Sequence, residues 1–114
     1  MTIEMIREKI STQKLRKLAD ASFGDMVKGV VDIQRRIVAL GGELHADCEA
    51  VLLEGGSQQE DLWGFNLYLD KPFRERLEFS SFVNIRPSRG NRSMEIKDPD
   101  LRKKMREIID SLVE

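Results

Sequence analysis

The middle of the chain repeats one hydrophobic pattern three times. Apolar and polar residues alternate with a period of two over residues 43–53, 61–69 and 77–86. This alternation is typical of strands that bury one face. A Gly-Gly pair follows the first segment and a Lys-Pro pair follows the second, and both favour turns. Because such short connections favour antiparallel neighbours, we expect a three-stranded antiparallel meander.

The segment before the meander shows a helical period. Over residues 25–40 the apolar positions step by four and three, at Met26, Val30, Ile33, Ile37 and Leu40. This spacing predicts an amphipathic helix, ended by a Gly-Gly pair at 41–42. The β-branched residues and Gly29 favour a hairpin over the same residues, and this alternative stays open.

Both ends of the chain carry clear element signals. Ile3, Met5 and Ile6 suggest a short strand, and Ser11 or Thr12 can cap a helix that follows it. Asp98-Pro99 is typical of a helix start, and we expect a helix over residues 99–113. The expected order is β-α-α-β-β-β-α. The sequence therefore predicts an α+β fold, with helices covering one face of the meander and the N-terminal segment as a candidate fourth strand.

Composition limits the class of protein. The 114 residues, 40% hydrophobic and 34% charged, suit a single domain over residues 1–114. No apolar run is long enough to span a membrane, and the N-terminus does not resemble a secretory signal. The single cysteine, Cys48, cannot form an internal disulfide, so we expect a cytoplasmic location.

Charge is unevenly distributed along the chain although the net charge is only −1. Residues 41–70 contain acidic side chains and no Lys or Arg, whereas residues 71–106 have an excess of basic side chains. The two halves either neutralise each other within one fold or meet between copies in an assembly. The balance as a whole gives no indication of a membrane partner.

The first predicted strand carries a candidate metal or catalytic group. Glu43, His45 and Asp47 are two residues apart, so on a strand they would point to the same face. One imidazole and two carboxylates could bind a divalent metal, or His45 could act as a general base held by a carboxylate. A solvated polar face explains the same pattern more simply, and we expect no metal, no cofactor and no catalytic residue.

The end of the third predicted strand carries a cluster of arginines. Arg86, Arg89 and Arg92 lie within seven positions, and Asn84 and Asn91 flank or interrupt the cluster. Guanidinium groups and exposed backbone amides together suit an anion or a phosphate backbone. The loop could therefore contact an anionic ligand or nucleic acid, or its arginines could pair with the acidic strand of the same chain.

Three sequence strings resemble a known family. They are Gly41-Gly42-Glu43-Leu44-His45-Ala46-Asp47, Asp61-Leu62-Trp63-Gly64-Phe65-Asn66-Leu67-Tyr68, and the run from Asn84 to Ser93. Together they resemble a small prokaryotic family known only as a domain of unknown function. The resemblance extends from about residue 22 to the C-terminus, implies a single compact domain, and assigns no activity.

The function that we expect is a non-enzymatic interaction module. The open polar face of the sheet would form the contact, with Phe82, Leu62 and Tyr68 as its apolar residues. We expect the chain to form a homodimer. Anion or nucleic-acid binding by the Arg86–Arg92 loop and a small metal-dependent enzyme at Glu43, His45 and Asp47 remain the alternatives.

Overall fold

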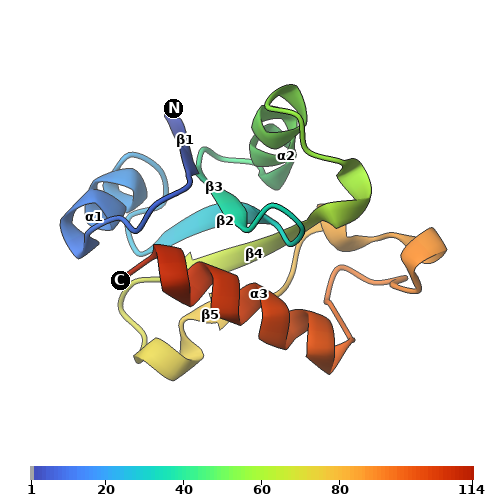
Figure 1. The fold of residues 1–114 in the computed structure, drawn as a ribbon. Helices are drawn as coiled ribbons and strands as arrows, with labels where there is room; N and C mark the ends of the chain where they lie inside the picture. The colour runs from blue at the N-terminus through green and yellow to red at the C-terminus, as the bar shows by residue number, and fades with distance from the viewer. Residues whose placement is uncertain (1) are drawn as a thin grey trace.

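A five-stranded antiparallel sheet organises the chain in the computed structural model, which describes residues 2–114 (Figure 1). The strands are β1 (Ile3–Ile6), β2 (Met26–Asp32), β3 (Ile37–Gly41), β4 (Leu62–Tyr68) and β5 (Leu77–Glu78). The helices are α1 (Thr12–Asp20), α2 (His45–Glu54) and α3 (Pro99–Leu112). The strand order is β1-β3-β2-β4-β5. The α+β class, the antiparallel sheet and the N-terminal strand are therefore confirmed, whereas three predicted elements, over residues 25–40, 43–53 and 77–86, differ from the structure.

The helix predicted over residues 25–40 is wrong, because β2 and β3 form a hairpin there. Both faces of this hairpin are covered, so its strands are almost continuously apolar and a period of two is hidden. The turn between them is closed by Asp32, whose Oδ1 accepts hydrogen bonds from the backbone N–H groups of Gln34 and Arg35, each at 2.9 Å. Arg36 completes the turn with a φ of 57°.

The strand predicted over residues 43–53 is also wrong, because this segment forms α2. Cys48 and Leu52, four positions apart, are the buried residues of the helix. The alternation that suggested a strand depended on Leu44 and on small alanines, yet Leu44 is 56% exposed. Alanine, leucine and glutamate have high helix propensity, and contact with the sheet needs only one narrow apolar stripe.

The third predicted strand is much shorter than expected. Only Leu77–Glu78 pairs with β4, and the chain then forms short 3-10 turns at Phe82–Asn84 and Pro87–Arg89. Ile85, which the predicted strand over residues 77–86 includes, lies between these two turns and is exposed. By contrast, the strand expected over residues 61–69 and the helix expected over 99–113 are confirmed as β4 and α3.

Helices lie on both faces of the sheet, rather than on one as expected. Residues of α1 and α3 pack on one face, around Phe65 and Leu67. Cys48 and Leu52 of α2 pack on the other face, with Val83 of the Phe82–Asn84 turn. The polar face that was expected to stay open is therefore largely covered. None of the helices formed by residues 2–114 has the length and apolar character needed to cross a membrane.

Candidate functional site

Arg86 is held within the chain rather than presented to a ligand. Its Nη2 lies 2.9 Å from Oε2 of Glu49 on α2, and its Nη1 donates to the carbonyl oxygen of Leu62 at 2.6 Å. The guanidinium also lies 5.1 Å from the ring centroid of Trp63. Burial lowers the pKa of Arg86, and the Glu49 carboxylate opposes this effect. Arg86 therefore ties α2 to β4, as the intrachain interpretation of the arginine loop requires.

Asn84 takes the place of a neighbouring strand along β4. Its Oδ1 accepts a hydrogen bond from the N–H of Gly64 at 2.7 Å, and its Nδ2 donates to the Gly64 carbonyl at 3.0 Å. Asn91 in turn donates from Nδ2 to the Asn84 carbonyl at 2.7 Å and accepts from the N–H of Lys97 at 3.2 Å. Both asparagines are buried, so these two predicted binding residues serve to shape the loop.

Arg89 and Arg92 differ from Arg86 because both are exposed. Among residues 2–114, no carboxylate lies within ion-pair distance of either guanidinium. The structure therefore separates the predicted cluster into one partly buried structural arginine and two exposed cations. Of these two, Arg89 lines two cavities, of about 510 and 320 Å³, beside Ser88.

His45 lies near polar groups of β4 and β5 rather than beside the two carboxylates that the sequence suggested. Its Nε2 is 2.8 Å from the carbonyl oxygen of Phe65, and since a carbonyl only accepts, Nε2 carries a hydrogen. Burial is the main cause that lowers the pKa of His45, which favours the neutral imidazole. Nearby, Glu78 Oε1 accepts from Asn66 Nδ2 at 2.7 Å and from the hydroxyl of Tyr68 at 3.2 Å.

Glu43 and Asp47 do not join His45 in a common site. Both are exposed. Glu43 precedes α2, whereas Asp47 lies two positions after His45 on the helix, and positions two apart on a helix point in different directions. Residues 2–114 contain no group of three His, Cys, Asp or Glu side chains placed to hold a metal ion. The metal-dependent enzyme required these three side chains to share one face of a strand, and the structure has a helix from His45 onward instead.

The predicted apolar contact patch does not form either. Phe82 is 76% exposed, but Leu62 is fully buried and Tyr68 is only partly exposed. Tyr68 makes a cation–π contact, with Lys71 Nζ 4.3 Å from its ring centroid. Phe82 is therefore exposed without the two apolar partners that the sequence suggested for it.

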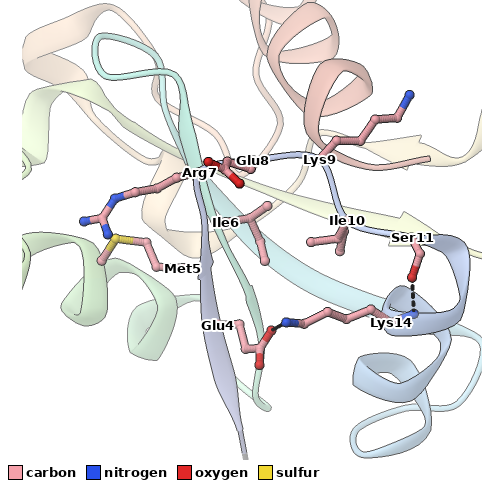
Figure 2. A pocket seen from close by; sticks show the side chains of 9 residues that line it. All are labelled: Glu4, Met5, Ile6, Arg7, Glu8, Lys9, Ile10, Ser11 and Lys14. Carbon is pink, nitrogen blue, oxygen red and sulfur yellow. Dashed lines mark hydrogen bonds and ion pairs between the residues drawn. The ribbon is translucent and has the colours of Figure 1, made fainter.

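The outer edge of β1 is the feature that sequence reasoning missed. β1 pairs with β3 on one side, and on the other side it borders a cavity of about 790 Å³ lined by Glu4–Ser11 and Lys14. Figure 2 shows the side chains of Met5 and Arg7 on one face of the strand, and those of Glu4, Ile6 and Ile10 on the opposite face. Glu4 and Lys14 form an ion pair of 2.8 Å beside it. Only the strand order of the sheet reveals that β1 is an edge.

Comparison with known proteins gives a family and no relative of known function. No curated protein and no solved structure matches the chain. The model of a family described as a protein of unknown function (DUF5674) matches residues 4–112. This range includes the three strings that suggested a domain family of unknown function and adds the N-terminal strand and helix. The chain therefore belongs to the DUF5674 family.

Proposed function

We propose that this protein is a non-enzymatic interaction module that associates with a second copy of itself through the outer edge of β1. The observation that carries the proposal is the unpaired backbone of this strand. Within residues 2–114, the backbone hydrogen-bonding partner of β1 is β3 alone. An edge strand with free N–H and C=O groups is a template for pairing with another chain.

The pairing registers identify the backbone groups that face outward. Both the N–H and the C=O of Gly64 bond to Asn84, on the side of β4 away from β2. Successive residues of a strand direct these groups to opposite sides. We followed this alternation through the registers of the β4–β2, β2–β3 and β3–β1 pairs. It places the backbone hydrogen bonds of Glu4 toward β3, so Ile3 and Met5 direct their N–H and C=O groups outward.

The opposite edge of the sheet supports the proposal by contrast. There, β5 covers the end of β4, Asn84 bonds both backbone groups of Gly64, and Arg86 bonds the carbonyl of Leu62. One edge is thus protected by buried side chains, whereas the β1 edge carries no such protection within the described part of the chain. Unprotected edges promote association, so natural proteins usually cover them unless they are used.

Charge selects one register for an antiparallel pair of β1 strands. Since the outward groups belong to odd-numbered residues, odd positions of the two copies must lie opposite each other. The two registers shifted by one step place Glu4 against Glu4 or against Glu8 of the second copy, and like charges directly opposite are destabilising. A further shift either pairs little more than residues 2–4 or places Arg7 against Arg7. The remaining register centres on Met5 facing Met5, with Ile3 facing Arg7 and Glu4 facing Ile6. It brings no like charges into direct opposition.

Replacement of Met5 by proline tests the proposal. The Met5 N–H points away from β3, so Met5→Pro removes a donor from the interface and leaves the β1–β3 hydrogen bonds in place. We expect light scattering to report a concentration-dependent dimer for the unmodified protein and a monomer for Met5→Pro. The interface is short, so the measurement should extend to high micromolar concentrations.

Met5→Leu is the matched control, because it changes the side chain and keeps the N–H. It should dimerise like the unmodified protein, and thermal unfolding should show that both variants are folded. A monomeric unmodified protein at high concentration, or a folded Met5→Pro variant that still dimerises, would contradict the proposal.

A further inference from the structure

A second cavity, remote in sequence from β1, is lined by a residue whose buried hydrogen-bond donor has no acceptor. It measures about 510 Å³ and lies between the β2–β3 turn, β4, the Pro87–Arg89 turn and the start of α3. Trp63 of β4 lines it and is only 2% exposed. Among residues 2–114, no oxygen accepts a hydrogen bond from the Trp63 Nε1–H. A buried donor without an acceptor is rare and destabilising, so it needs an explanation.

Three further donors line the same cavity. Arg89 and Lys104 supply positive charges, and Ser88 supplies a hydroxyl group. Arg89 and Lys104 are exposed, and within the described chain neither forms an ion pair. Cationic groups and neutral N–H or O–H donors at one cavity are the combination that binds a carboxylate or phosphate group.

The acidic and apolar residues of the cavity further limit the kinds of ligand that it suits. Asp98 and Asp100 also line it, so the charges of the lining residues balance and a polyanion would be repelled in part. Asp98 Oδ1 is engaged in capping α3, where it accepts from the N–H of Asp100 at 2.9 Å. Ile33 and Leu101 add apolar surface. The lining therefore suits a small molecule that combines one anionic group with an apolar part.

We propose that this cavity binds a small organic anion, a carboxylate or a phosphate monoester. Arg89 and Lys104 hold the anionic group, the Trp63 Nε1–H donates to one of the ligand's oxygens, and Ile33 with Leu101 contacts its apolar part. The site is independent of the proposed pairing through β1. It assigns to Arg89 the anion contact that the sequence suggested for the whole loop, and it assigns none to Arg86 or Arg92.

Fluorescence provides a site-specific test, because Trp63 is the single tryptophan of the chain. Benzoate and phenyl phosphate serve as the organic probes, and inorganic phosphate reports on the anionic group alone. We expect saturable changes in Trp63 emission with both organic probes and weaker binding of inorganic phosphate. Arg89→Gln and Lys104→Gln should each weaken binding about tenfold, the size expected for the loss of a charged hydrogen bond.

Arg92→Gln is the matched control, since Arg92 is an exposed arginine of the same loop that does not line the cavity. It should bind the probes as the unmodified protein does. Trp63→Phe keeps an aromatic ring and removes the donor, so calorimetry should show weaker binding while thermal unfolding confirms a folded protein.

Three results would overturn the proposal. The first is the absence of saturable binding of either organic probe. The second is an Arg92→Gln variant that weakens binding as much as Arg89→Gln does. The third is tight, steeply salt-dependent binding of a single-stranded oligonucleotide by the unmodified protein without binding of the organic probes, which would indicate a nucleic-acid surface instead.

Discussion

At the scale of single residues, polar side chains bond the backbone of β4 where no neighbouring strand pairs with it. The side-chain amide of Asn84 bonds both backbone groups of Gly64, and Arg86 bonds the Leu62 carbonyl, which faces the same edge of β4. Gly64 lets the segment that carries Asn84 approach β4 closely, because a Cβ there would lie 2.7 Å from Cβ of Ser81 and 2.8 Å from Cγ2 of Val83. Cys48 is fully buried, and burial raises the pKa of its thiol to about 12, so it behaves as a small apolar residue.

His45 should make the stability of the protein depend on pH. Burial, with a smaller contribution from Lys28, lowers its pKa in the folded state against the opposing effects of the Phe65 carbonyl, Asn66 and Glu78. In the unfolded chain the pKa is about 6.5. As the pH falls through that value, the unfolded state takes up the proton first, so the free energy of unfolding decreases.

His45→Gln tests this effect, because glutamine keeps a donor for the Phe65 carbonyl and does not titrate. Urea unfolding of both proteins between about pH 7.5 and 5.5, on either side of the unfolded pKa, should show a steeper loss of stability for the unmodified protein. Since His45 is the single histidine, an equal pH dependence in the variant would contradict the assignment.

At the scale of elements, Gly29 records which structure residues 25–40 adopt. It lies in β2, and a Cβ there would overlap Cζ of Phe65 and lie 2.8 Å from Cδ2 of Leu40. The glycine that counted against a helix therefore exists because two large side chains cross over it. Packing across the sheet leaves no room for a side chain at this position, and the spacing of apolar residues along the sequence carries no information about such packing.

Gly29→Ala distinguishes the hairpin from the predicted helix by the sign of the effect. In a helix the substitution would stabilise the protein by about 1 kcal/mol, whereas overpacking beneath Phe65 should destabilise it by about 1–3 kcal/mol. Gly55→Ala is the control, since Gly55 has an ordinary φ of −81° and the one close neighbour of its Cβ would be the flexible end of Met5, with the Val51 and Leu52 carbonyls at an ordinary 3.5 Å. Denaturant unfolding of both variants measures the difference, and a stabilised Gly29→Ala protein would contradict the hairpin.

At the scale of the whole molecule, Arg76 joins the end of the chain to the sheet. It precedes β5, and its guanidinium donates to the carbonyl oxygens of Val113 and Glu114 at 3.0 and 2.8 Å. The same group pairs with Asp110 of α3 at 2.8 Å. Because Arg76 is buried, one side chain holds α3 in place over the edge of the sheet.

Arg76→Ala should therefore destabilise the protein by about 2–4 kcal/mol, since it leaves Asp110 and two carbonyl groups without their donor. Arg74→Ala is the control, because Arg74 is an exposed arginine two positions away, and it should change stability by less than about 0.5 kcal/mol. Urea unfolding measures both. A small effect of Arg76→Ala would show that α3 is held by its apolar contacts alone.

The sequence by itself determined the α+β class, the N-terminal strand, β4 and α3. Each of these elements carries local signals, such as the Asp98-Pro99 start of α3, that do not depend on distant parts of the chain. The sequence also singled out the loop that contains Arg89, although it grouped this exposed side chain with Arg86, which is partly buried and paired within the chain.

The tertiary structure alone decided the hairpin, α2 and the two proposed sites. β2 and β3 are covered on both faces, so their apolar runs fit either period, and only pairing with β4 and β1 fixes them as strands. α2 packs on the sheet through a narrow stripe, Cys48 and Leu52. Its sequence alternates apolar and polar residues, and this alternation wrongly suggested a strand. The open edge of β1 and the cavity beside Trp63 arise where segments distant in sequence meet, and no local pattern encodes such a meeting.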